Sequence, residues 1–266
     1  MINLDEKKYY IYGGFGLAIV LLLITLFSFF SVPKYEVSTT SNIPTSDTNT
    51  TGNGETTKVY SKPQVESVAD VSSEENYSIK LTKPSGLPTA VQEAIDNDFS
   101  KKKLAFIKKY SAKPSSILEN NQPQIYQSGK YISIVSVFLE YNGSDLESKD
   151  SLCWTYDQDT KAIVSLPQIL ESDDKAYTYL SATLKPLVLS SLAGRSDVVN
   201  SQIDGLNTKI GNVLTADVKN YSKWYLDGDQ LIFMFSTSLF LDVKASEEKI
   251  TLGFSESKNN LKSQAN

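Results

Sequence analysis

The feature that most constrains this chain is an apolar run near its N-terminus. Residues 9–32 read YYIYGGFGLAIVLLLITLFSFFSV, and no charged residue lies between Lys8 and Lys34. A helix of 24 residues is long enough to cross a bilayer with some tilt. Tyrosines at the start of the run and phenylalanines at its end match the aromatic residues that gather at membrane surfaces. The sequence therefore predicts a transmembrane helix over residues 9–32.

This helix is predicted to remain as an anchor, with a cleaved signal peptide as the alternative. A signal peptide has a shorter apolar stretch and a small-residue cleavage site, whereas this run ends in FFSVP. Lys7 and Lys8 precede the run and Lys34 alone follows it closely, so the positive-inside rule places the N-terminus in the cytoplasm. We expect a single-pass protein of the cell membrane, with a short cytoplasmic tail (1–8) and the C-terminal domain outside.

Residues 33–75 differ in composition from the segments on either side. Ser and Thr make up 15 of the 41 residues from Tyr35 to Glu75, and seven acidic residues against two lysines give this stretch a net charge of −5. A segment with few large apolar side chains buries too little surface to offset the entropy lost on ordering. We therefore predict a disordered tether with a root-mean-square reach of about 35 Å.

Residues 76–266 are predicted to form one extracytoplasmic α+β domain, with a mainly antiparallel sheet and packed helices. Their 21 basic and 22 acidic residues nearly balance, so nothing favours nucleic acid as a partner. The strongest strand pattern, residues 130–141, has apolar residues on both alternations and predicts a central strand. The predicted strands are 77–82, 124–127, 130–141, 151–156, 162–166, 221–226, 230–235 and 249–254; the predicted helices are 87–110, 166–170 and 174–192, with a partly helical stretch in 197–212.

The chain contains no histidine and one cysteine. The lack of histidine excludes Ser-His-Asp and Cys-His catalysis, His-containing zinc sites and imidazole pH switches. Cys153 cannot form an intramolecular disulfide and is expected to be buried as a small apolar residue, with a reactive or intermolecular thiol as the alternative. No cofactor and no metal is expected.

The order of these patterns resembles a known family. PSGL leads into the helix pattern AVQEAIDNDF, and KYISIVSVFLEY, WTYDQDTKAIVSLPQIL and the terminal WYLDGDQLIFMF follow. This order is similar to the extracytoplasmic domain of the lysozyme-responsive anti-sigma factors of Gram-positive bacteria (RsiV-like, DUF3298-type), which also occurs next to peptidoglycan deacetylase domains. The most specific part, Tyr156 to Leu166, resembles the family's strand, Asp-containing turn, strand and helix start. The resemblance covers residues 77 to about 256 and implies a recognition module for a cell-wall component or a wall-acting protein.

Two departures from that family limit what the resemblance implies. The family usually has a Gly-Gly-Ala-His type loop after its central strand, whereas YNGSD here has one glycine and no histidine. The anti-sigma factors also hold their sigma factor with a folded cytoplasmic region, which residues 1–8 are too short to supply. No sigma factor is therefore expected as a partner.

The contact surface is predicted at the polar loop 142–150 and the neighbouring strand ends, because loops often carry binding residues. The candidate ligand-binding residues are Asn142, Gly143, Ser144, Asp145, Asp157 and Asp159. Asp157-Gln158-Asp159 and Asp227-Gly228-Asp229 both fall at predicted hairpin turns, where Asp is favoured because it satisfies turn backbone groups. We therefore predict no catalytic residue, with a carboxylate-only hydrolase or a calcium site at Asp157 and Asp159 as weaker alternatives.

The sequence thus predicts a non-catalytic, membrane-anchored recognition module for a cell-envelope ligand or a wall-acting protein. The alternative is a structural or accessory subunit of a bacterial envelope assembly, acting partly through glycines of its transmembrane helix. We predict that a lysine-rich face of the helix at 87–110 is solvated, with contact to wall or lipid phosphates as the alternative. We predict that a set of aromatic residues belongs to the core, with a sugar-stacking platform as the alternative. The lysines are Lys101, Lys102, Lys103, Lys108 and Lys109, and the aromatic residues are Trp154, Tyr156, Trp224, Tyr225 and Phe240.

Overall fold

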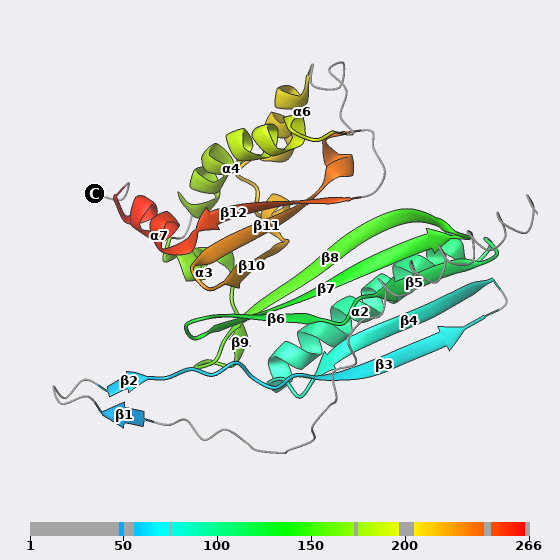
Figure 1. Ribbon diagram of the computed structural model, residues 1–266, viewed down its shortest axis with the longest axis horizontal. Helices are drawn as coiled ribbons and strands as arrows, with labels where there is room; N and C mark the ends of the chain where they lie inside the picture. Colours follow the sequence, from blue (N-terminus) through cyan, green and yellow to red (C-terminus); the bar gives the residue numbers. More distant parts are fainter. Residues whose placement is uncertain are drawn as a thin grey trace, which may run out of the picture. The chain divides into compact units, whose positions relative to one another are not determined.

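The computed structural model in Figure 1 describes residues 48–50, 56–74, 76–172, 175–196, 205–241 and 246–263. All of them belong to one compact unit, Asp47–Asn266. The predicted transmembrane helix lies outside the described residues. None of the described helices has both the length and the apolar character needed to cross a membrane.

The larger of the two main sheets has seven strands, and β7 lies at its centre. The strand order is β3-β4-β5-β7-β8-β9, with β6 also paired to β7. Every pairing is antiparallel except β4 with β5. The strands are β3 (Glu66–Ser73), β4 (Tyr77–Ser85), β5 (Ser116–Asn120), β6 (Gln124–Ser128), β7 (Tyr131–Asn142), β8 (Asp145–Asp157) and β9 (Ala162–Ile163). The prediction of a central strand at residues 130–141 is confirmed, because β7 pairs with β5, β6 and β8. A separate ribbon joins β1 (Thr48–Thr50) to β2 (Thr56–Lys58).

Helix α2 (Thr89–Tyr110) covers one face of this sheet (Figure 1). Its buried side chains recur at intervals of four or seven residues and form an apolar stripe along the helix. They are Val91, Ile95, Phe99, Phe106 and Tyr110, and they share a core with Ile79, Leu118, Ile134, Phe138 and Trp154 of the sheet. Leu104 of the same helix is exposed. The helix begins after Pro88, so Thr89 is its first residue.

The smaller sheet has three antiparallel strands in the order β10-β11-β12, and helices lie on one side of it (Figure 1). The strands are β10 (Trp224–Asp227), β11 (Gln230–Ser236) and β12 (Glu247–Gly253). The helices are α3 (Leu166–Leu170), α4 (Lys175–Ala193), α6 (Leu206–Val213) and α7 (Phe254–Ser263), with 3₁₀ turns η1 (Val218–Tyr221) and η2 (Thr237–Leu239). A second core forms between sheet and helices, and it includes Leu180, Leu184, Val188, Phe233 and Leu252. These elements confirm the predicted α+β class with a mainly antiparallel sheet and packed helices.

The two sheets contact each other through a small third core. Val135 of β7 packs with Tyr225, Ile232 and Met234 of the smaller sheet. The Leu226 amide donates to Ser133 Oγ of β7 at 2.9 Å, which satisfies a buried hydroxyl at the same junction. β7 therefore contributes to a core on each of its faces, as the apolar residues on both alternations predicted.

Two predicted segment boundaries are wrong. Glu66–Ser73, placed in the disordered tether, form β3 and pair along their full length with β4. This edge strand is held by backbone hydrogen bonds and buries little side-chain surface. The hydrophobic pattern of residues 66–73 therefore did not indicate a strand. The polar loop predicted at 142–150 is a short turn, because β8 already begins at Asp145. The first three residues of β8 are exposed and two of them, Asp145 and Glu147, are acidic, which made this part of the strand resemble a loop.

Candidate functional site

The first part of the predicted contact surface is the turn between β7 and β8. Asn142 pairs with Asp145 across this turn, and Gly143 has a φ of 62°, a left-handed conformation that favours glycine. Gly143, Ser144 and Asp145 are exposed. Asn142 Nδ2 donates to Glu147 Oε1 at 2.9 Å, which ties the turn to its own strand. These four residues form an exposed hairpin tip.

Asp157 and Asp159 lie at the opposite end of the same hairpin. Asp157 pairs with Tyr131, the first residue of β7, whereas Asn142 is the last. The 12 residues of this strand span roughly 36 Å. The structure therefore does not bring the six predicted ligand-binding residues together in one surface.

The two carboxylates of this turn are already engaged. Asp157 Oδ2 lies 2.7 Å from the Lys130 ammonium, and Asp157 Oδ1 accepts the Asp159 amide at 2.7 Å. Asp159 pairs with Lys58 and accepts a hydrogen bond of 2.8 Å from the Tyr60 hydroxyl. Burial would raise the pKa of Asp157, but Lys130 and the turn amides lower it; hydrogen bonds from Lys58 and Tyr60 lower the pKa of Asp159. Asp157 therefore stabilises the turn, and Asp159 holds the chain segment that precedes β3.

The second Asp-rich turn, between β10 and β11, also has a structural role. Asp227 pairs with Gln230 at the end of the hairpin, and Gly228 has a φ of 55°. Asp229 Oδ1 accepts from the backbone amide of Ser255 at 2.9 Å at the start of α7. This bond fixes the helix start against the hairpin, as expected for a carboxylate near a helix N-terminus.

The structure reveals a different candidate, a charged cleft between α2, β8 and the loop before β10. Its volume is about 510 Å³, within the range of small-molecule sites. We call it the charged cleft. Its lining residues are Asp98, Lys101, Lys102, Ala105, Asp150, Ser151, Leu152, Cys153, Trp154, Ser222 and Lys223.

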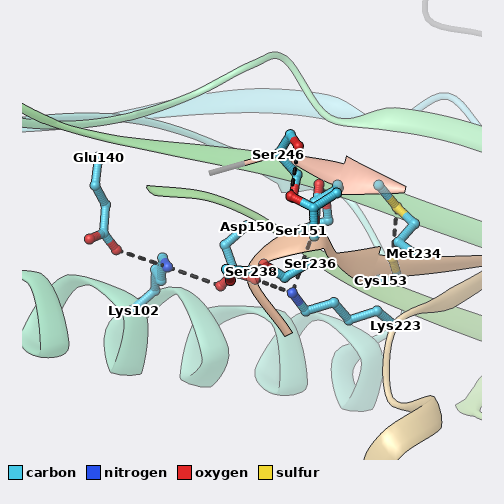
Figure 2. Close-up of polar contacts among 12 residues, drawn as sticks. Lys102, Glu140, Asp150, Ser151, Cys153, Lys223, Met234, Ser236, Ser238 and Ser246 are labelled. Carbon is cyan, nitrogen blue, oxygen red and sulfur yellow. Dashed lines mark hydrogen bonds and ion pairs between the residues drawn. The ribbon is translucent and has the colours of Figure 1, made fainter. Parts of the chain in front are cut away.

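A chain of ion pairs runs along this cleft (Figure 2). Lys102 Nζ lies 3.0 Å from both Glu140 Oε1 of β7 and Asp150 Oδ2 of β8. Asp150 also pairs with Lys223, whose ammonium lies 3.6 Å from Glu247 Oε1 of β12. Five side chains from both sheets, α2 and the loop before β10 are thereby joined.

The charges of this chain stabilise one another in a partly buried setting. The Lys102 side chain is 14% exposed and the Glu247 side chain 1%. Burial would raise the pKa of Asp150, but Lys223 and Lys102 lower it below its ordinary value. Glu140 likewise has a lowered pKa, because Lys102 and Lys109 outweigh the effect of burial. The carboxylates are therefore held ionised, since their neighbouring lysines compensate for the lost solvation.

Apart from Asp98 and Lys101, neutral and apolar groups line the rest of the cleft. Trp154 Nε1 donates to Asp98 Oδ2 at 3.0 Å, so the indole ring is fixed by its polar edge. Burial raises the pKa of the Cys153 thiol to about 12, and its sulfur lies 4.0 Å from Met234 Sδ (Figure 2). The thiol is therefore protonated at neutral pH, and Cys153 is partly buried and packs against the core shared by the two sheets, although it was predicted to be buried. The five aromatic residues weighed as a sugar platform are all buried, which confirms their assignment to the core.

Sequence reasoning missed the charged cleft because its members are far apart in the chain. The lysines of α2 were predicted to be solvated, yet Lys102, Lys103 and Lys109 all pair with carboxylates of the sheet. The periodicity of α2 does place Lys102 three residues after Phe99 of the apolar stripe, and this was the available signal.

Among the residues that the structure describes, no group of His, Cys, Asp or Glu is arranged to hold a metal ion.

Comparisons with known proteins give structural similarity at low sequence identity. No protein-family model matches the sequence, and no curated protein matches it. One similar solved structure is a DUF3298 family protein from Pseudomonas aeruginosa PAO1, with 12% identity and a TM-score of 0.46 over 76% of this chain and 94% of that chain. Another is a member of the DUF3298 family from Bacteroides fragilis NCTC 9343, with 12% identity and a TM-score of 0.41 over 73% of this chain and 91% of that chain.

Proposed function

We propose that this protein is a membrane-anchored extracytoplasmic recognition module that binds a cell-envelope ligand or a wall-acting protein and does not catalyse a reaction. The apolar run at residues 9–32 supports the anchor, and the sequence resemblance supports the class of ligand. The observation that carries the proposal is the charged cleft. We propose this cleft as the contact surface in place of the hairpin tip at 142–145.

The charged side chains of the cleft are preorganised, which favours binding. Its charged side chains are fixed before a ligand arrives, because Lys102 and Lys223 each contact two carboxylates. A preorganised surface loses less side-chain entropy on association. Lys101 and Asp98 form a more exposed pair at 3.0 Å, which can exchange its internal contact for contacts with a ligand.

The composition of the cleft fits a ligand that carries both charges and many polar groups. Ammonium and carboxylate groups lie beside serine hydroxyls and a fixed indole ring. Glycan–peptide fragments of a bacterial wall carry hydroxyl, amide, amine and carboxylate groups, and a protein surface offers the same set. A carboxylate that acts as general acid needs a raised pKa, whereas Asp150 and Glu140 have lowered values, so their chemistry favours recognition.

The test is a binding titration with the full-length chain in detergent, using lysozyme and soluble peptidoglycan fragments as probes. Lys101→Glu, inside the cleft, is compared with Lys108→Glu, an exposed lysine on the same helix that does not line it. We expect the first variant to weaken binding about tenfold and the second to leave it within about twofold. Asp145→Ala at the hairpin tip should also leave it unchanged.

Absence of affinity for both probes would contradict the proposed ligand class. Equal affinity of the wild-type chain and Lys101→Glu would instead contradict the assignment of the contact surface to the charged cleft.

A further inference from the structure

A second hollow lies at the other end of β8 from the hairpin tip. Its volume is about 340 Å³. It is a shallow, open depression, bordered by the segment before β3, the turn between β4 and α2, and the turn between β8 and β9. Its lining residues are Pro63, Gly86, Leu87, Pro88, Tyr156, Gln158 and Lys161.

Three side chains of this hollow have polar groups without a partner among the described residues. The Nε2 atom of Gln158 is buried and makes no hydrogen bond there. The Tyr156 hydroxyl has no hydrogen bond to any residue that the structure describes, and the ammonium of Lys161, an exposed residue, has no ion pair within the same ranges. An unpaired buried donor costs free energy that a matching acceptor would restore. All three groups are hydrogen-bond donors, and one carries a positive charge.

The backbone of Lys161 gives an independent reason to connect this residue with binding. Its φ is 57°, a left-handed conformation that glycine or asparagine adopts with less strain. The turn nevertheless has a lysine at this position, and its side chain lines the hollow. Strained residues of this kind occur preferentially at sites where their side chain has a use.

The remaining walls are apolar. Pro63, Leu87 and Pro88 contribute hydrocarbon surface, and Gly86, at a φ of 78°, adds no side chain. A ligand that satisfies both parts of the hollow therefore has a negatively charged acceptor for the three donors and a small alkyl group for the walls.

We propose that this hollow binds the carboxylate end of a short peptide whose last residue has a small alkyl side chain. The two oxygens of a carboxylate accept from Lys161, Gln158 and Tyr156, and the alkyl group contacts the prolines and Leu87. This site is separate from the charged cleft and does not depend on the proposed contact surface there.

The segment that contributes Pro63 is held in place by neighbouring contacts. Lys58 and Tyr60 both bind Asp159, and Gln127 Nε2 donates to the Tyr60 carbonyl at 2.9 Å. The predicted site residue Asp159 therefore acts as a positioning residue for one wall of the hollow.

The experiment is isothermal titration of the full-length chain in detergent with N-acetyl-alanyl-alanine, its C-terminal amide and butyrate. We expect the acid to bind and the amide and butyrate to bind at least tenfold more weakly. Lys161→Gln should weaken binding of the acid about tenfold, whereas Lys108→Gln, an exposed lysine remote from the hollow, should leave it unchanged.

A further variant separates binding from folding. Lys161→Gly relieves the left-handed strain, so its Tm should equal or exceed that of the wild-type chain while its affinity for the acid is lost. Equal binding of acid and amide, unchanged affinity in Lys161→Gln, or no binding of the acid up to about 10 mM would overturn the proposal. If butyrate binds as tightly as the acid, the claim that the ligand is a peptide is overturned.

Discussion

At the scale of single residues, Lys102 shows how the charged cleft is stabilised. Its ammonium contacts carboxylates from β7 and β8, and its side chain is mostly buried. A buried ion pair is weak evidence of stabilisation by itself, because desolvation offsets the attraction. Removing one member is different, since it leaves buried charges without compensation.

We therefore expect Lys102→Met to lower the free energy of unfolding by about 2–4 kcal/mol. In this variant Glu140 still pairs with Lys109, and Asp150 still pairs with Lys223. Because both carboxylates retain one cationic partner, we expect a loss near the lower end of this range. Urea denaturation followed by circular dichroism measures the change. The matched control is Lys101→Ala, whose side chain is 66% exposed and whose loss should cost no more than about 0.5 kcal/mol. Equal effects of the two variants would show that Lys102 has no special role.

The same residues predict how stability depends on pH. Asp150 and Glu140 have folded-state pKa values below their ordinary values of 3.8 and 4.5. Their stabilisation is therefore complete above about pH 4.5 and is lost as the pH falls through the folded-state values. In Lys102→Met the burial of both carboxylates is less compensated, so the loss of stability below about pH 4.5 should be shallower than in the wild-type chain. Unfolding free energies measured from pH 3 to pH 7 test this, and parallel curves would contradict it.

At the scale of elements, β3 is a strand whose stability depends little on a core. Most of its side chains are exposed, and it is attached by backbone pairing to β4 and by the Lys103–Asp70 ion pair at 3.1 Å. A strand of this kind opens locally without unfolding the rest of the domain. Its attachment to α2 therefore controls how often the edge of β4 becomes exposed.

Lys103→Ala should accelerate hydrogen exchange of the β3 amides about twofold to threefold. This corresponds to the modest free energy of a partly exposed ion pair. Exchange measured by mass spectrometry on peptides that cover residues 66–73 gives the ratio. Lys108→Ala, on the same helix without an ion pair to any described residue, is the control and should leave exchange unchanged. Exchange in the wild-type chain at the rate of an unstructured peptide would contradict the existence of β3 itself.

The elements that the sequence predicted well are those with a buried periodic face. α2 has apolar residues along one face and β7 has them on both faces, and the structure places these residues in the cores. β3 and the first half of β8 were missed because few of their side chains are buried, and hairpin and edge pairing require no apolar pattern. Neither hollow was predictable, because each joins residues from at least three separate segments whose contact depends on tertiary packing.

At the scale of the whole molecule, the two hollows lie along one element. Residues 150–154 of β8 line the charged cleft, and Tyr156 and Gln158 line the second hollow. The strand connects them to both sheets, since it pairs with β7 and contributes Cys153 to the core shared with the smaller sheet. The proposed recognition by this domain would therefore depend on the packing of β8 and not on the sequence of the proposed anchor, residues 9–32.

A recognition module and an assembly subunit that acts through a transmembrane helix differ in how far their function depends on residues 9–32. Replacing residues 9–32 with an unrelated spanning helix should leave affinity for peptidoglycan fragments or lysozyme within about twofold, because no residue of the cleft lies in that segment. Replacing Gly13, Gly14 and Gly16 by leucine should also leave it unchanged, although it removes the small residues that allow close helix packing. Titrations with the protein in lipid vesicles measure both. Loss of affinity in either variant, with an unchanged circular dichroism spectrum of the domain, would favour the assembly subunit.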